Sequence, residues 1–310
     1  VVLHAYNGYP NGSMFWAPKR MDLFTVMDPY GADPSPWDVQ LATHEPRHQA
    51  QLQAGYRGAW KPLSYLLGEI WSSAVWALYP SQALSEGDAV TVETALSGGA
   101  RTRTADFLNY FRVAFDEGDK RNWYRWRYGS YRHYTPDYYK VGYMTVAGVR
   151  YFYDRPLFVK EYFDHVTAHP FSIGNLQKTT RKASGKSFKD SFSDIMDGFH
   201  GIWQEEAAAR APFMRAEPLT EAGRFPADYS SPVPADSVLF ALKRGYARSP
   251  VLVKIENGKE KPVRPFSGRT SSLTLVNPLR RLFWSETVGD LRWDLAHTSR
   301  IRFLDLENGI

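Results

Sequence analysis

Residues 44–48 read His44-Glu45-Pro46-Arg47-His48, a pattern in which two histidines stand four residues apart and a glutamate follows the first. Four residues make about one turn of an α-helix, so both imidazoles project from one face and can bind the same metal ion. Glu45 is then placed to act as a general base on a water at that ion. The motif therefore predicts a metal centre carried by a helix.

The residues around the motif predict the helix itself. Ser35 is a suitable N-cap, Pro36 suits the first helical position, and Asp38 follows at capping-box spacing. Gly55 is the expected stop. Pro46 lies inside this helix, where it removes a hydrogen bond and crowds the preceding turn, at a cost of ~3 kcal/mol or more. Two interpretations stay open: neighbouring contacts hold the turn together, or the site has lost its activity while the fold remains.

A catalytic zinc site needs a third protein ligand and an open fourth position. The chain has no cysteine, which excludes thiolate ligands. The metzincin continuation needs glycine and histidine where this chain has Gln51 and Ala54, so that class is excluded as well. A carboxylate from a second helix remains. Glu86, in Ser85-Glu86-Gly87-Asp88-Ala89, is the candidate, and we expect it in the first turn of a helix that begins near Ser85, where a negative charge is favourable.

With this second segment, the chain resembles the gluzincin metallopeptidases, in which the glutamate of an E-G-x-A segment is the third zinc ligand. Four segments, two of which contain these motifs, are similar to large bacterial envelope proteins in which a gluzincin-like domain precedes a TolB-like β-propeller. The resemblance covers most of residues 1–205. The segments that carry it are 16–20, 41–51, 86–96 and 139–143.

The resemblance implies a set of roles for individual residues. His44, His48 and Glu86 would be ligands of Zn²⁺, and Glu45 would be the general base in the hydrolysis of a peptide or protein substrate. Asp88 and Glu93 are candidate partners for the ligand imidazoles. The full set of implied metal and base residues is His44, His48, Glu86 and Glu45.

Related peptidases also use a tyrosine or histidine on a later helix to donate a hydrogen bond to the oxyanion. Tyr139 is the first candidate here, and Tyr143, one turn along the same helix, is the second. Residues 11–17 match the edge strand with which such enzymes align an extended peptide. The same resemblance implies a location in the bacterial cell envelope, with envelope protein partners bound through the propeller.

The pattern of the whole chain predicts an α+β protein. We expect a mainly helical, gluzincin-like domain with a short N-terminal sheet over residues 1–206, a Pro-rich linker over 207–236, and the opening strands of an incomplete β-propeller over 237–310. Asn11-Gly12 reads as a turn in an extended N-terminal region. The expected helices after the first span 63–79, which is apolar enough to be buried, 85–96, 136–153 and the periodic stretch 188–202.

Strand-like segments dominate the last part of the chain. Two of them end in Glu256-Asn257-Gly258 and Glu307-Asn308-Gly309, about 50 residues apart, which favours repeated blades. An Asn-Gly turn normally introduces a hairpin partner, and we therefore expect the natural polypeptide to continue past Ile310. The expected strands are 238–242, 251–255, 272–276, 281–285 and 300–306.

Composition and motifs also indicate which other functions are expected. A formal net charge of +5 over 310 residues is weak support for nucleic-acid binding, and we expect none. We also expect no transmembrane segment, because no apolar run reaches about 20 residues. His165 and His169 stand one helical turn apart, so a second metal site is an open, weaker alternative. The competing function is a non-catalytic envelope scaffold or binding subunit with a peptidase-derived domain.

Overall fold

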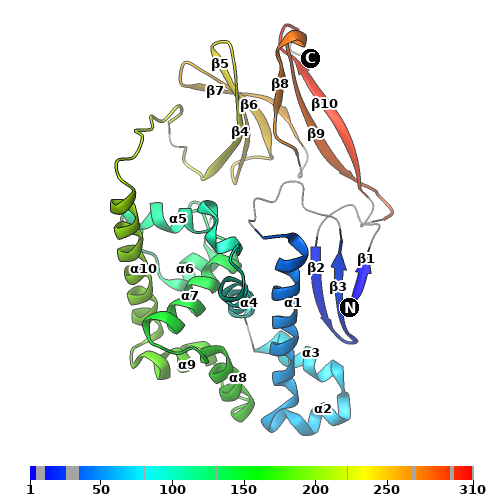
Figure 1. Cartoon of the computed structure of the whole chain (residues 1–310), viewed down its shortest axis with the longest axis vertical. Helices are drawn as coiled ribbons and strands as arrows, with labels where there is room; N and C mark the ends of the chain where they lie inside the picture. Colours follow the sequence, from blue (N-terminus) through cyan, green and yellow to red (C-terminus); the bar gives the residue numbers. More distant parts are fainter. Residues whose placement is uncertain are drawn as a thin grey trace. The chain divides into compact units, whose positions relative to one another are not determined.

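A computed structural model describes residues 1–4, 11–25, 35–79, 81–129, 131–221, 223–266, 270–293 and 297–308. The protein is of mixed α+β class, with three small sheets and no closed barrel among these residues. The chain divides into two compact units (Figure 1). Within the described residues, the first unit holds 1–4, 11–129 and 135–212, and the second holds 131–134 and 213–308.

The first unit begins with a three-stranded sheet beside the helix of the histidine motif (Figure 1). The strand order is β1-β3-β2, with β1 parallel and β2 antiparallel to β3. The bounds are Val2–His4 for β1, Asn11–Trp16 for β2 and Lys19–Phe24 for β3. The turn predicted at Asn11-Gly12 is wrong, because these residues open β2 and the chain turns at Ala17-Pro18 instead.

Ten α-helices are described, all in the first unit. They are α1 (Trp37–Leu52), α2 (Lys61–Leu67), α3 (Glu69–Leu78), α4 (Gln82–Leu96), α5 (Ala105–Asp116), α6 (Trp123–Tyr128), α7 (Tyr138–Phe152), α8 (Phe158–Ala168), α9 (Asn175–Ser184) and α10 (Phe188–Arg210). Three 3₁₀ turns join them: Gln53–Tyr56, Gly58–Trp60 and Arg101–Arg103.

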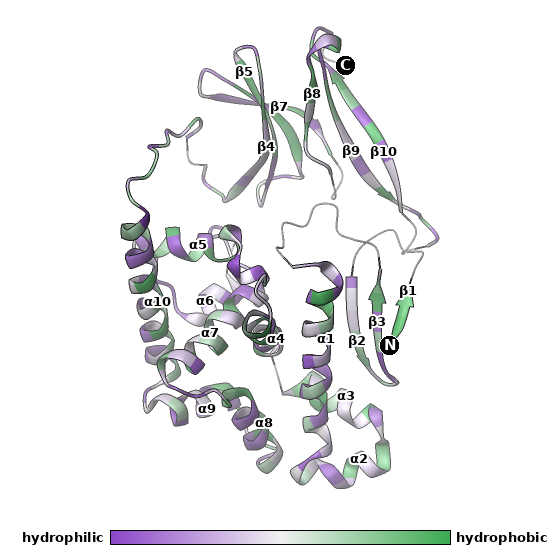
Figure 2. Cartoon of the chain, in the orientation of Figure 1, coloured by the Kyte–Doolittle hydropathy of each residue, from purple (hydrophilic) through white to green (hydrophobic). Residues whose placement is uncertain are grey.

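Two of the helix predictions are confirmed. Asp137 caps α7 by accepting a hydrogen bond from the Lys140 amide, and Ser187 caps α10 through the Asp190 amide. The apolar stripe predicted for α10 packs inward at Phe188, Phe192 and Ile195, and Figure 2 shows hydrophobic and hydrophilic residues interspersed along this helix. The two caps lie at the expected starts of these helices.

The start of α1 differs from the prediction. Pro36, rather than Ser35, occupies the N-cap position, and no side chain caps the helix. The Ser35 hydroxyl instead lies 2.8 Å from the hydroxyl of Ser97, a residue distant in sequence. The helix then runs without a break through Pro46.

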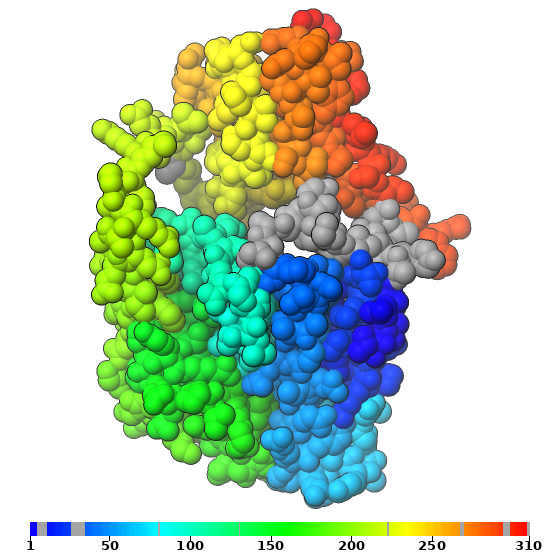
Figure 3. Space-filling model, viewed as in Figure 1, coloured from blue at the N-terminus to red at the C-terminus, as the bar shows by residue number. Residues whose placement is uncertain are grey.

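The region predicted as one buried helix over residues 63–79 is two helices, α2 and α3. Gly68, with φ of 58°, separates them. The expected burial is wrong: Tyr65, Leu66 and Ile70 are 79%, 77% and 69% exposed. Figure 3 shows this hairpin, in light blue, at the molecular surface. Among the described residues, no helix is both long and apolar enough to cross a bilayer.

The helix expected from Ser85 begins three residues earlier. Ser81 caps α4 by accepting a hydrogen bond from the Leu84 amide, and the helix starts at Gln82. Glu86 is therefore in the second turn, so the predicted stabilisation at a helix N-terminus does not apply to it. The side chain of Glu86 must be held by other contacts.

The helices of the first unit pack around two buried clusters. One contains Phe111, Trp126 and Met144, and the other contains Phe158, Tyr162 and Ile195. Helices α4 and α7 pack against each other in the middle of the unit, and α10 packs on both α7 and α5. The candidate site lies on the α1 and α4 side of this core.

The second unit contains two antiparallel sheets. The first has the strand order β4-β5-β6-β7, and the second has the order β10-β9-β8. The bounds are Ala227–Ala235 for β4, Val238–Gly245 for β5, Val251–Glu256 for β6, Lys259–Pro265 for β7, Thr274–Val276 for β8, Arg281–Gly289 for β9 and His297–Asp305 for β10.

These strands confirm the expected strand segments and correct the expected linker. Part of the stretch 207–236 is β4, which pairs with β5 through a register shift between Ser230 and Val233. The predicted turn at Asn257-Gly258 joins β6 to β7, and both residues have positive φ, as a tight hairpin requires. The predicted turn at 307–309 and the end at Ile310 lie partly outside the described residues.

Candidate metal centre

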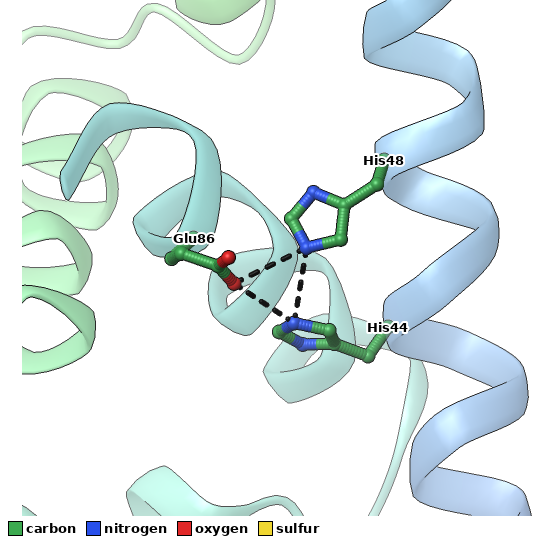
Figure 4. Close-up of side chains that lie close together, drawn as sticks. All are labelled: His44, His48 and Glu86. Carbon is green, nitrogen blue, oxygen red and sulfur yellow. Dashed lines mark hydrogen bonds and ion pairs between the residues drawn. The ribbon is translucent and has the colours of Figure 1, made fainter. Parts of the chain in front are cut away.

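Three side chains from two helices meet at one point. His44 and His48 project from one face of α1, and Glu86 projects toward them from α4 (Figure 4). The Oε2 atom of Glu86 lies 3.1 Å from each histidine Nε2, and the two Nε2 atoms are 3.2 Å apart. These three residues form a group that could hold a metal ion.

The hydrogen bonds on the far side of the rings determine which nitrogen carries the proton. Nδ1 of His44 lies 3.3 Å from a carboxylate oxygen of Glu93, which can only accept. Nδ1 of His48 lies 3.0 Å from Oε1 of Gln51, an amide oxygen that also accepts. Both histidines therefore carry hydrogen on Nδ1 when neutral, and both Nε2 lone pairs face the carboxylate of Glu86.

Three acceptors then converge without a proton between them. Such an arrangement is repulsive in a buried site unless a cation, or an added proton, occupies the centre. Tetrahedral zinc, with bonds of about 2.0–2.1 Å, requires ligand atoms about 3.3 Å apart, which is close to the observed separations. The donor set and its size therefore fit a small divalent cation.

The two imidazoles are supported in different ways. Glu93 is fully buried and is also paired with Arg101, whose Nη2 lies 3.1 Å from the carboxylate. Gln51, by contrast, presents a neutral oxygen to His48 and donates its amide hydrogen to Asp88 over 2.7 Å. The predicted partner role is thus direct for Glu93 and indirect for Asp88.

Asp88 is fully buried and holds Gln51, the residue that supports His48. Arg47 on α1 and Arg150 on α7 each contact its carboxylate at 2.7 Å. The Gln51 amide also donates to the backbone oxygen of Ser85 over 2.9 Å. This network joins α1, α4 and α7 and fixes the ring of His48 through Gln51.

The electrostatics of the centre follow from burial and these pairs. Burial raises the pKa of Glu86, but in the metal-free centre hydrogen bonds from His44 and His48, made when an added proton is on Nε2, outweigh burial and lower that pKa to about 2. Burial lowers the pKa of His44, yet its bonds to Glu86 and Glu93 leave that pKa above the usual value. The carboxylate is therefore ionised at any ordinary pH, and a proton competes with a cation for His44.

Glu45 is close enough to His44, His48 and Glu86 to interact with their charges, and it is 6% exposed. Burial raises the pKa of its carboxyl group, and the neighbouring His44 and His48 oppose that shift. The strand β2 passes directly over it, so a Cβ atom on Gly12 would come within 3.2 Å of Oε1 of Glu45. Only glycine allows this close approach without a shift of the neighbouring groups.

The two candidate tyrosines on α7 are placed differently. The ring of Tyr139 lies 6.1 Å from the ring of His44 and under the guanidinium of Arg101. The ring of Tyr143 instead packs edge-on against Phe107, with the ring centroids 6.0 Å apart. Burial raises the pKa of the Tyr143 hydroxyl group, and a hydrogen bond with Thr102 opposes that shift. The structure brings Tyr139 to the centre and does not bring Tyr143 there.

A contact between two glycines sets the distance from α4 to α7. A Cβ atom on Gly87 would lie 2.1 Å from the carbonyl carbon of Gly142, and one on Gly142 would lie 1.8 Å from the oxygen of Ala83. The backbones thus touch directly. Gly87 follows Glu86, and Gly142 is one turn after Tyr139, so this contact brings a ligand and a candidate hydrogen-bond donor to the same site.

Sequence reasoning missed several residues of the centre. Gln51 lies three residues after His48 on the same helix face, so its spacing could have identified it. Trp76, whose ring stands edge-on to His48 at 5.9 Å, carried no such pattern. Arg101 lies in a short turn after α4, and nothing in its local sequence indicates its contact with Glu93.

Comparison with protein families, with curated proteins and with solved structures finds no match for this chain.

Proposed function

We propose that this chain is a zinc-dependent peptidase of the gluzincin type, with His44, His48 and Glu86 as the metal ligands. The observation that carries the proposal is the meeting of three acceptor atoms, from two buried histidines and the partly buried Glu86, within 3.2 Å of one another. Glu45 and Tyr139 lie at the same place. A bound cation would satisfy all three acceptors at once.

Zinc, when bound, would polarise the scissile carbonyl and lower the pKa of a water molecule. Glu45 accepts the proton of that water and delivers it to the leaving amine. Its burial supports this role, because burial raises the pKa of the carboxyl group and so makes it a better proton acceptor than an exposed glutamate. Glu93 and Gln51 hold the two imidazoles in the required tautomer.

Tyr139 is the proposed donor to the oxyanion of the tetrahedral intermediate. Burial, followed by the nearby charge of Glu86, raises the pKa of its hydroxyl group, so the group keeps its proton at neutral pH. A preorganised donor of this kind stabilises charge that develops in the transition state. Tyr143, turned toward Phe107 and Thr102, has no part in this step.

The sheet supports a peptide substrate. β2 is at the edge of the described sheet, and its Gly12 lies against Glu45. An extended peptide that pairs with the outer side of β2 would run past the base and the metal ligands. Main-chain hydrogen bonds of this kind bind peptides with little dependence on their side chains.

The test compares Glu45→Gln with the wild-type protein on a peptide library. We expect the variant to retain its zinc and to lose at least about a hundredfold in turnover, because only the proton transfer is removed. Tyr139→Phe should lose turnover as well, whereas Tyr143→Phe is the matched control on the same helix and should stay active. Unaltered activity in Glu45→Gln would refute the assignment. Zinc binding without any turnover in the wild type would favour the scaffold function.

We also propose that the second unit is the opening of a TolB-like β-propeller in a bacterial envelope protein. Support comes from the four-stranded antiparallel meander β4-β5-β6-β7, followed by a second antiparallel sheet in chain order. Blades of a propeller have this four-stranded form. Envelope protein partners would then bind through this part.

A further inference from the structure

One end of the first unit exposes large apolar side chains from two segments. The first is the α2–α3 hairpin, which lies where α1 ends (Figure 1), and the second is the loop between α8 and α9. The Tyr79 hydroxyl donates a hydrogen bond to the Pro170 carbonyl, and Leu78 and Phe171 line the same cavity, so the two segments adjoin. We call the surface that they form the apolar end. Its most exposed members, at 69–95%, are Tyr65, Leu66, Ile70, Leu78, Phe171 and Ile173.

The hairpin reverses the usual amphipathic pattern. A helix on the surface of a soluble protein normally turns its apolar side chains inward and its polar ones outward. In α2 and α3 the buried residues are Ser64, Ser72 and Val75, all of them small. Ser72 donates a hydrogen bond to the carbonyl of Leu52 over 3.0 Å, and its Cα atom would lie 3.1 Å from a Cβ atom on Gly55. The hairpin therefore packs through a close backbone approach, and the large side chains of the apolar end remain available to another partner.

The charge beside the apolar end is mainly positive. From residue 57 to the end of α3, three side chains carry a formal charge: Arg57, Lys61 and Glu69. The Glu69 carboxylate accepts a hydrogen bond from the Lys19 amide over 3.0 Å, and the loop 169–174 contains no acidic residue. Arg57 and Lys61 are exposed, and neither forms an ion pair with another residue that the structure describes. The two basic side chains are therefore complementary to an anionic surface.

The tip of the hairpin has open space around it. Gly68, with φ of 58°, turns the chain between α2 and α3, and, apart from its neighbours in the chain, no described atom lies within 4 Å of the position of an added Cβ atom. Leu66 and Ile70 stand two residues to either side of this glycine. Nζ of Lys61 lies 6.0 Å from the centre of the Tyr65 ring. Exposed leucine and isoleucine with an aromatic ring and a basic side chain beside them are typical of segments that lie in the interface of a bilayer.

We propose that the apolar end inserts into the headgroup region of a lipid bilayer that contains anionic lipids. Tyr65, Leu66 and Ile70 enter the boundary between headgroups and acyl chains, and Arg57 and Lys61 bind the lipid phosphates. Burial of apolar area and attraction to anionic lipids add together in binding of this kind. A fluid bilayer needs no concave partner surface, which suits a projecting tip. None of these residues belongs to the metal centre, so membrane binding is independent of its chemistry.

The experiment measures flotation of the purified full chain with vesicles of phosphatidylcholine alone and of phosphatidylcholine with phosphatidylglycerol. We expect binding to the anionic vesicles, and Leu66→Ser/Ile70→Ser should weaken it at least about tenfold, because two apolar side chains lose their burial in the bilayer. Arg57→Ala/Lys61→Ala should weaken binding to the anionic vesicles and leave any binding to phosphatidylcholine unchanged. The matched control, Leu279→Ser/Ile301→Ser, removes an exposed leucine and an exposed isoleucine from the second unit and should bind as the wild type does.

A label at single positions locates the contact. The chain has no cysteine, so Leu66→Cys and Leu279→Cys can each be labelled at one site with a polarity-sensitive fluorophore. On adding anionic vesicles, emission should shift to the blue in the first variant and stay constant in the second. Thermal unfolding checks the fold, and Leu66→Ser/Ile70→Ser should keep the wild-type midpoint because both side chains are exposed.

Three results would overturn the proposal. The first is wild-type protein that floats with neither kind of vesicle, or that binds no better than Leu66→Ser/Ile70→Ser. The second is self-association without lipid that disappears in Leu66→Ser/Ile70→Ser, which would assign the apolar end to a second copy of the chain. The third is a blue shift from Leu279→Cys instead of Leu66→Cys, which would place the membrane contact in the second unit.

Discussion

Replacing Gly142 with alanine tests whether the α4–α7 contact holds the centre together. The new Cβ atom would lie 1.8 Å from the backbone oxygen of Ala83 and 2.9 Å from the Cα atom of Gly87. Ordinary contact begins near 3.4 Å, so the two helices must separate by about 1.5 Å. Backbone atoms cannot rotate away as a flexible side chain can, so the strain must be relieved by movement of a helix.

The expected loss of stability can be estimated from two opposing terms. Overpacking of this kind typically costs about 1–3 kcal/mol, and a clash with backbone belongs at the upper end. Alanine in place of glycine in a helix returns about 1 kcal/mol. The net loss is therefore about 2 kcal/mol, which corresponds to a fall in Tm of roughly 5 °C for a unit of this size.

The assay is thermal and urea unfolding, followed by measurements of zinc content and turnover. Gly201→Ala in α10 is the matched control, because nothing lies within 4 Å of its added Cβ atom. That variant should gain up to about 1 kcal/mol. The three metal ligands are on α1 and α4, so Gly142→Ala should keep its zinc while turnover falls as Tyr139 on α7 moves away. A Gly142→Ala protein as stable as Gly201→Ala would refute the reasoning.

Two further predictions concern the metal centre itself. Gln51→Leu removes the acceptor for Nδ1 of His48, so zinc affinity measured by chelator competition should fall about 10–100-fold. An unchanged dissociation constant would show that Gln51, held by Asp88, does not position the ring of His48. Zinc affinity should also weaken as the pH falls toward 6.5, because protons compete with zinc for His44. The raised pKa of His44 makes this competition begin at a higher pH than for an ordinary histidine. In the metal-free protein the same raised pKa has the opposite effect on stability: its contribution is fully present below about pH 6.5 and is lost as pH rises through the folded-state pKa. Chelator competition and urea unfolding at pH 6, 7 and 8 check both signs, and parallel trends for affinity and metal-free stability would contradict them.

The group that could hold a metal ion was predicted from the sequence because its geometry is local. Helical spacing places His44 and His48 on one face, and the E-G-x-A resemblance identified Glu86. The structure brings the three together despite Pro46, since α1 is continuous and the Nε2 atoms are 3.2 Å apart. The ligand set did not depend on the exact start of either helix.

Long-range contacts could not be predicted in the same way. Arg101 reaches Glu93 from a short turn, and the Gly87–Gly142 contact joins two residues that are 55 positions apart in the sequence. Residues 227–235 looked like a linker because Pro232 and Pro234 obscure the alternation of a strand, yet pairing with β5 makes them β4. Tertiary pairing overrode the local pattern there.

The most direct test of the central claim is the zinc content of the purified protein, measured by elemental analysis before and after dialysis against a chelator. Three converging acceptors predict about one zinc per chain, removed by the chelator and restored on adding zinc. His48→Ala and Glu86→Ala should abolish that stoichiometry, whereas His200→Ala, a histidine paired with Asp116 on the far helices α10 and α5, should keep it. A wild-type protein that binds no zinc when zinc is supplied in excess would contradict the account.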